Sequence, residues 1–218
     1  MQTRPAGWFP KIAAGIASVN GRKLINWFQS LKKARRVRAV NLETSRKLYE
    51  SIVLQSREPS FYSFTKIPDT VNGRFELIVL HLFLLLYCFR RNSIATLVSQ
   101  NLINVMTEDL DRALRQMGTG DLSVGRKVRK MASVIQVRLR AYQSALEGGD
   151  EALGTVLYEF LFASVEPKPD FEIKLITDYV RQAIKRLLKM PSNEVVSGRV
   201  VFPIPPDFTS RELRCAER

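Results

Sequence analysis

Apolar side chains recur every three or four residues along most of the chain, which is the spacing of one face of an α-helix. The pattern is cleanest between residues 121 and 147, just before Gly148 and Gly149, and its apolar positions are Val124, Val128, Met131, Ile135, Leu139, Tyr142 and Leu146. Similar patterns predict helices from residue 44 to just before Pro59, and over 98–117, 150–165 and 173–188. The fold class is therefore predicted to be all-α, a compact helical bundle of six or seven helices.

The longest apolar run, Leu77–Phe89, has 13 residues. A helix that crosses a bilayer needs about 20 apolar residues, so this run predicts a buried central helix of the bundle. Asp69 or Asn72 is the expected N-cap, because short polar side chains bond the first free N–H groups of a helix. The segment from Pro59 to Thr70 is expected to be a loop.

Two glycines are expected to separate the helices on either side of residue 119. Gly118 is predicted to end one helix, and Asp121 or Ser123 is predicted to cap the next. A positive φ is expected at Gly118 and Gly120, so that valine at either position would destabilise the fold.

Charge divides the chain unevenly. Residues 1–42 hold nine basic residues and no acidic one, so the 34 basic residues of the chain leave 25 beyond residue 42, against 21 acidic. Together with the prolines after Pro191, this predicts a basic N-terminal amphipathic arm (1–42), a helical domain (43–190) and an irregular C-terminal tail (191–218).

The arm carries an apolar stripe framed by cations, the pattern of a helix that lies in a membrane interface. The residues expected to bind an anionic membrane are Leu24, Trp27, Phe28, Leu31, Lys32, Lys33, Arg35 and Arg36. Two alternatives stay open: the stripe can dock on the protein's own core, and the basic arm can bind phosphate on RNA. A mitochondrial transit segment also fits this composition.

The sequence offers little for catalysis or for a metal. Its single histidine, His81, stands among leucines and is expected to be a buried residue with partners inside the bundle. Cys88 and Cys215 match no zinc spacing, and no nucleotide-binding or hydrolase motif is present, so neither a cofactor nor an enzymatic activity is predicted.

Charged faces on the predicted helices are expected to be ordinary solvated surfaces. Glu108 with Arg112, and Asp111 with Arg115, have the i, i+4 spacing of stabilising pairs. The basic residues between Arg126 and Arg140 are interpreted as spread around their helix.

Three long stretches resemble the ubiquinol–cytochrome c chaperone family, which includes the mitochondrial cytochrome b assembly chaperones and bacterial relatives. They are residues 49–62, with Tyr-Glu-Ser-Ile-Val and Arg-Glu-Pro-Ser-Phe-Tyr; residues 67–84, with Gly-Arg-Phe and Leu-His; and residues 106–124, with Asp-Arg-Ala-Leu-Arg-Gln-Met-Gly and Gly-Asp-Leu-Ser-Val. The chain departs from the family pattern at Gln116, where the family tends to have glutamate, and at Val137, where it tends to have glycine.

The resemblance implies a non-enzymatic assembly chaperone that holds newly made cytochrome b while the ubiquinol–cytochrome c reductase (bc1) complex is built. It also implies a small helper protein, the ribosome and the inner membrane as partners. The residues expected to contact the client or a partner are Phe61, Tyr62, Arg74, Asp109, Arg112 and Arg115. The expected location is the cytoplasmic side of a bacterial inner membrane, with the mitochondrial matrix as alternative. The alternative function is an RNA- or ribosome-binding module that acts through its basic arm.

Overall fold

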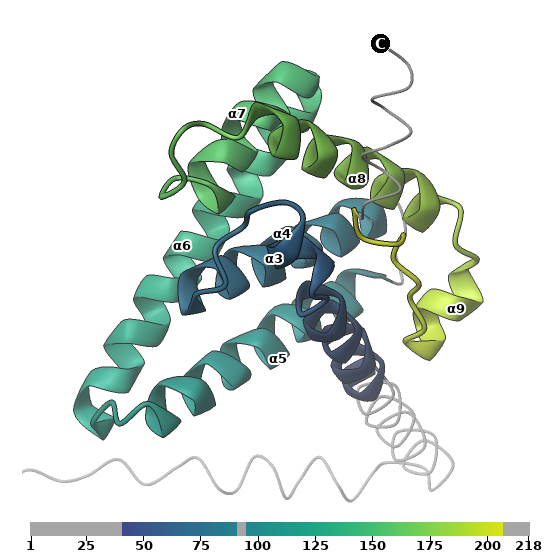
Figure 1. Ribbon diagram of the computed structural model, residues 1–218. Coiled ribbons are helices and arrows are strands. Elements are labelled where there is room, and N and C mark those ends of the chain that lie inside the picture. The colour runs from purple at the N-terminus through teal and green to yellow at the C-terminus, as the bar shows by residue number, and fades with distance from the viewer. Residues whose placement is uncertain (1–40, 91–94, 207–218) are drawn as a thin grey trace, which may run out of the picture. The chain divides into compact units, whose positions relative to one another are not determined.

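The computed structural model describes residues 41–90 and 95–206. Residues 41–56 are helical, and the following helices are α3 (Ser60–Ser63), α4 (Val71–Phe89), α5 (Ala95–Gln116), α6 (Asp121–Glu147), α7 (Asp150–Leu161), α8 (Asp170–Leu188) and α9 (Ser192–Ser197) (Figure 1). The described residues contain no β-strand. The prediction of an all-α bundle is confirmed.

The apolar helix α4 forms the centre of the bundle, as predicted. It contacts α5, α6, α7 and α8, and nearly all of its residues from Leu77 to Leu85 are buried. By length and composition α4 is apolar enough to cross a membrane, but 61% of its most apolar window is buried inside the protein. The other helices thus cover the surface that a lipid chain would otherwise contact.

The start of α4 differs from the prediction. Thr70, rather than Asp69 or Asn72, is the N-cap, and its hydroxyl accepts a hydrogen bond from the Gly73 N–H at 3.1 Å. Asp69 is unavailable because its carboxylate pairs with Arg74.

Helices α5 and α6 form an antiparallel hairpin whose turn ends α5 as predicted. The Thr119 N–H donates to the Leu114 carbonyl at 3.1 Å and the Gly118 N–H to the Arg115 carbonyl at 3.0 Å, the two bonds of a Schellman motif. Gly118 has a φ of 79°. Two predictions for the start of α6 were wrong. The N-cap is Gly120 rather than Asp121 or Ser123, without a side-chain capping bond, and the φ of Gly120 is −62° rather than positive.

Two further segments differ from the sequence expectations. The expected loop after Pro59 contains the short helix α3, whose Phe61 is buried. Helix α7 ends at Leu161 rather than near residue 165. The segment after Pro191 begins with α9 and continues without regular structure to residue 206, and its Phe202 is buried against the core. That segment is therefore part of the bundle and not wholly irregular.

The chain divides into two compact units, residues 1–40 and 41–218. All described residues belong to the second unit, so every residue expected to bind a membrane lies outside the described residues. The membrane-binding arm stays a prediction.

Candidate partner-binding surface

A groove of about 560 Å³ opens between the 41–56 helix and α5, and we call it the α5 groove. Each helix contributes residues at steps of three or four, so one face of each helix forms one wall. The lining residues are Arg46, Tyr49, Glu50, Val53, Leu54, Arg57, Val105, Glu108, Asp109 and Arg112. Two of the predicted contact residues, Asp109 and Arg112, are among them.

A buried tyrosine fixes the floor of the α5 groove. The Tyr49 hydroxyl donates to Asp109 Oδ2 at 2.9 Å, and Arg112 Nη1 lies 3.4 Å from Asp109 Oδ1. Burial, and then the negative charge of Asp109, raise the pKa of Tyr49 well above its ordinary value. Asp109 is thus held between a neutral donor from one wall and a cation of its own helix. Arg112 was expected to pair with Glu108 and pairs with Asp109 instead.

The rim of the α5 groove combines apolar and charged groups. Leu54 is 69% exposed and lies with Val53 among three arginines and two glutamates: Arg46, Arg57, Arg112, Glu50 and Glu108. An exposed leucine ringed by charges of both signs suits an amphipathic segment better than a small anion or cation.

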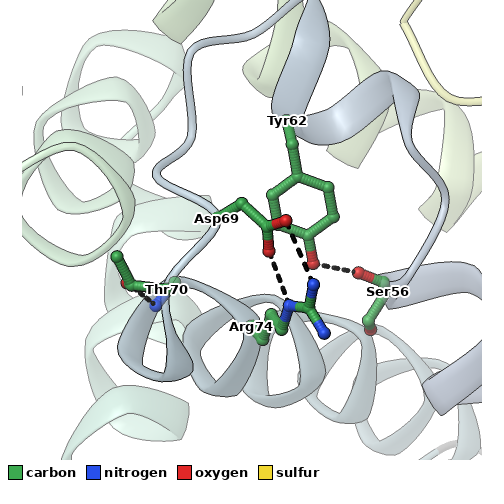
Figure 2. A network of polar contacts seen from close by, with 6 residues as sticks. Ser56, Tyr62, Asp69, Thr70 and Arg74 are labelled. Atoms are coloured by element: carbon green, nitrogen blue, oxygen red, sulfur yellow. Dashed lines mark hydrogen bonds and ion pairs between the residues drawn. The ribbon is translucent and has the colours of Figure 1, made fainter.

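A second polar cluster lies at the start of α4 (Figure 2). Arg74 forms a forked pair with Asp69, at 2.5 Å from Nε to Oδ1 and 3.0 Å from Nη2 to Oδ2. Its guanidinium also lies 6.0 Å from the centre of the Tyr62 ring, and the Tyr62 hydroxyl donates to the Ser56 carbonyl at 2.6 Å. Hydrogen bonding to Arg74 lowers the pKa of Asp69, so this carboxylate stays charged.

Arg57, which lines the α5 groove, acts electrostatically on a tyrosine in each region. Its positive charge acts on the hydroxyls of both Tyr49 and Tyr62, and on each it lowers the pKa against the larger effect of burial. Arg57 thus lies within electrostatic range of one tyrosine in the α5 groove and one in the Tyr62–Arg74 cluster.

The structure treats the six predicted contact residues differently. Asp109 and Arg112 line the α5 groove, whereas Tyr62 and Arg74 belong to the cluster at the start of α4. Arg115 lies outside the groove lining and pairs with Asp111 at 2.6 Å and with Asp121 at the α5–α6 turn. Phe61 is 0% exposed and packs edge-on against His81 at 5.5 Å between ring centres, so its side chain cannot offer a contact in this conformation. The expected exposure of Phe61 rested on a loop, whereas the chain forms a buried turn of helix here.

Several groove residues were missed by sequence reasoning. Tyr49, Val53 and Arg57 lie in the first stretch that resembles the family, but neither they nor Leu54 were predicted to contact a partner. A signal was available: Arg46, Glu50, Val53 and Arg57 repeat at three and four residues beside the buried stripe. The repeat alone does not indicate which helix packs beside it, because that helix is distant in the sequence.

His81 is buried and fully bonded, as predicted. Its Nδ1 lies 2.8 Å from the Leu77 carbonyl, which can only accept, so Nδ1 carries the proton. Nε2 then accepts from the Tyr179 hydroxyl at 2.8 Å, and that hydroxyl in turn accepts from Gln55 Nε2 at 3.1 Å. Burial lowers the pKa of His81 to about 4, so the ring is neutral at physiological pH. This arrangement ties three helices together and leaves the histidine no access to a substrate.

Comparison with known proteins places this architecture in a family. Residues 65–202 match the sequence profile described as ubiquinol-cytochrome C chaperone. The ubiquinol-cytochrome-c reductase complex assembly factor 1 of Xenopus laevis is 21% identical over 72% of this chain and 78% of its own. The mouse protein of the same name is 20% identical over 69% of this chain, which spans about half, 51%, of the mouse sequence.

A solved structure agrees with these matches. The crystal structure of the Cbp3 homolog from Brucella abortus superposes with a TM-score of 0.70 and 28% sequence identity. The match covers 80% of this chain and 96% of the Brucella chain.

Proposed function

The chain belongs to the ubiquinol–cytochrome c chaperone family, and on that premise we propose that it promotes bc1 complex assembly by holding newly made cytochrome b. The family match covers most of the helical body, and relatives of matching sequence are named as assembly factors of that complex. The activity is proposed to be binding alone, without catalysis.

The α5 groove carries the proposal of where the client binds. A segment of a membrane protein that has not yet inserted exposes apolar side chains beside charged helix ends. In the groove, Leu54, Val53 and Val105 can pack against the apolar side chains of the client. The arginines and glutamates on its rim can pair with the client's charged helix ends. The Tyr49–Asp109 hydrogen bond holds the floor of the groove in place before the client binds. Binding therefore costs less free energy for ordering the groove side chains.

The Tyr62–Arg74 cluster is also proposed to contact the client or a helper protein. Its forked Asp69–Arg74 pair holds the guanidinium beside the aromatic ring, so both present a rigid edge. We place the protein on the cytoplasmic side of a bacterial inner membrane. Its higher identity to the Brucella chain, 28%, than to the Xenopus chain, 21%, supports a bacterial protein.

Complementation of a deletion strain tests this function. A strain lacking the gene would receive the wild-type chain or the double variant Leu54→Ser, Arg112→Ala, which removes one apolar and one cationic group from the groove rim. We expect the wild type to restore spectroscopically measured bc1 complex and the groove variant to leave most of it unassembled. A photo-crosslinking amino acid at position 54 should capture cytochrome b during its synthesis.

A matched control variant distinguishes the loss of the groove residues from the effect of changing any exposed surface residues. The variant Lys174→Ala, Leu188→Ser removes the same two kinds of exposed group from α8, and it should restore the complex fully. If the groove variant restores the bc1 complex fully and crosslinking to cytochrome b is unchanged, the α5 groove is not the client-binding site. Normal bc1 levels in the deletion strain itself would contradict the assembly role.

A further inference from the structure

One face of α6 is exposed along almost the whole helix. Positions at steps of three, four and seven share a face, and here they include one leucine, one valine and four cations. These outer-face residues, all exposed, are Leu122, Arg126, Arg129, Lys130, Val137 and Arg140. From the first to the last the face is about 27 Å long, at 1.5 Å per residue.

The structure corrects the expectation that the basic residues are spread around this helix. Arg138 turns inward to Glu76 and Lys127 bonds Thr119 Oγ1 at 3.0 Å, which leaves the other four cations on one side. No acidic residue occurs between Asp121 and Glu147 in the sequence. In the part of the chain that the structure describes, the ion pairs of α6 involve only Arg138 and Asp121. The outer face is thus a band of uncompensated positive charge.

Apolar groups accompany this charge. Leu122 is 99% exposed in the first turn of α6, and Val137 is 58% exposed on the same face. Met117, at the other side of the α5–α6 turn, is 67% exposed. This turn lies at the end of the hairpin remote from α8 and α9 (Figure 1). The hairpin end therefore presents two large apolar side chains beside a cationic band.

This combination fits a membrane better than a nucleic acid. Cations near an anionic lipid surface attract it, and apolar side chains enter the interface between headgroups and acyl chains. Binding to single-stranded RNA relies instead on aromatic side chains that stack on bases, and residues 122–141 contain none.

We propose that the outer face of α6 binds the anionic phospholipid surface of a membrane, with Leu122 inserted at the interface. This surface belongs to the helical body and is separate from the basic arm. It does not depend on the proposed function, because it requires only an acidic lipid surface and no client.

Binding of the full-length chain to vesicles tests the charge contribution. The face variant replaces Arg126, Arg129, Lys130 and Arg140 with glutamine, in the wild-type chain and in a chain whose Lys32, Lys33, Arg35 and Arg36 are also glutamine. On phosphatidylglycerol-containing vesicles we expect the face variant to lose about tenfold or more in affinity in both backgrounds. The matched control replaces four exposed cations with glutamine, Lys174, Lys185 and Arg186 of α8 and Lys189 at its C-cap, and should lose much less.

A fluorescent reporter tests insertion and does not depend on how the face variant folds. Both natural tryptophans lie in the arm, so Trp8→Phe, Trp27→Phe and Leu122→Trp together leave one tryptophan at the hairpin end. Its emission should shift to shorter wavelength when anionic vesicles are added and stay shifted at high salt, because hydrophobic insertion is not screened. A matched reporter at Leu188, on α8, should not shift.

Three outcomes would overturn the proposal. The first is an emission of the position-122 tryptophan that vesicles do not change. The second is a face variant that binds vesicles as well as the wild type, or no worse than the α8 control. The third is a face variant that keeps its vesicle affinity but loses affinity for RNA, which would assign the cations to RNA.

Discussion

Gly118 and Gly120 stand two residues apart in the α5–α6 turn and meet different conformational demands. Gly118 has a φ of 79°, in the left-handed region, where a Cβ atom is strained. Gly120 has a φ of −62° and ψ of 145°, which any residue adopts. A Cβ atom built at either position meets nothing within 4 Å, so only backbone conformation separates them.

Alanine substitutions at these glycines should therefore differ in their effect on the free energy of unfolding. Gly118→Ala should lower the free energy of unfolding by about 1 kcal/mol, the cost of left-handed backbone for a residue with a Cβ. Gly120→Ala should cost less, because its backbone conformation suits any residue and only the weaker N-cap preference of alanine opposes the change. Urea denaturation of the two variants measures both, and equal losses would contradict the assigned backbone conformations.

His81 should make stability depend on pH in a range where few other groups titrate. In the unfolded chain its pKa is 6.5, and in the folded protein burial lowers the pKa to about 4. Above pH 6.5 the ring is neutral in both states; as the pH falls from 6.5 toward 4, the unfolded chain takes up the proton first, so stability is lost. Between pH 7.5 and 5 this loss should be about 2 kcal/mol.

The chain has one histidine, so a single variant provides the control. His81→Gln should be less stable than the wild type at pH 7.5, because the Leu77 and Tyr179 bonds are altered, but nearly independent of pH between 7.5 and 5. Denaturation at several pH values checks this. An equal fall in both proteins would assign the effect to other groups.

Helices α4, α6 and α7 are joined by a buried ion pair. Arg138 Nη2 lies 3.1 Å from Glu76 Oε1, and the guanidinium stacks 3.8 Å from the centre of the Phe160 ring. The Glu76 side chain is only 2% exposed, while that of Arg138 is 25% exposed. Burial raises the pKa of Glu76, and the pairing with Arg138 opposes that rise.

Replacing Arg138 should lower the free energy of unfolding more than replacing Glu76. Arg138→Met strands a buried carboxylate and should cost about 3–5 kcal/mol at pH 7. Glu76→Gln should cost less, because Arg138 keeps access to water. Lowering the pH should reduce the cost of Arg138→Met, since Glu76 can then take up a proton. Denaturation of both variants at pH 7 and 5 measures this, and a larger loss for Glu76→Gln would contradict it.

The second unit has a core of its own that begins with Leu48 and Ile52 in the 41–56 helix and ends with Phe202. Residues 1–40 hold all nine cations of the arm and its apolar stripe. The second unit should therefore fold without residues 1–40, and residues 1–40 should contribute mainly to membrane binding.

Removal of residues 1–40 should leave the body folded and weaken its binding to anionic vesicles. Each lost cation near the surface contributes about 1 kcal/mol, so even half of them would reduce binding by orders of magnitude. The proposed α6 face should leave a weak remainder. Circular dichroism and vesicle flotation of full-length and truncated chains test this, and an unfolded truncated body would show that the arm packs on the core.

Helix positions were predictable because they depend on local spacing. The stripe from Val124 to Leu146 and the apolar run of α4 each specify a helix through side chains that are neighbours in the sequence. The Schellman turn at Gly118 followed from the same local chemistry. Helix starts were less predictable. The Asp69 carboxylate could bond either the first N–H groups of α4 or the Arg74 guanidinium; it pairs with Arg74, and Thr70 is the N-cap.

The sequence alone therefore determined the helices, the buried central run and the family, since each is written in residues close together along the chain. Tertiary structure alone decided which faces meet. Tyr49 and Asp109 are 60 residues apart yet share a hydrogen bond, and only the packing of two helices creates the groove between them. Packing likewise buried Phe61 and turned Arg138 inward, because a side chain's exposure depends on neighbours that local spacing does not specify.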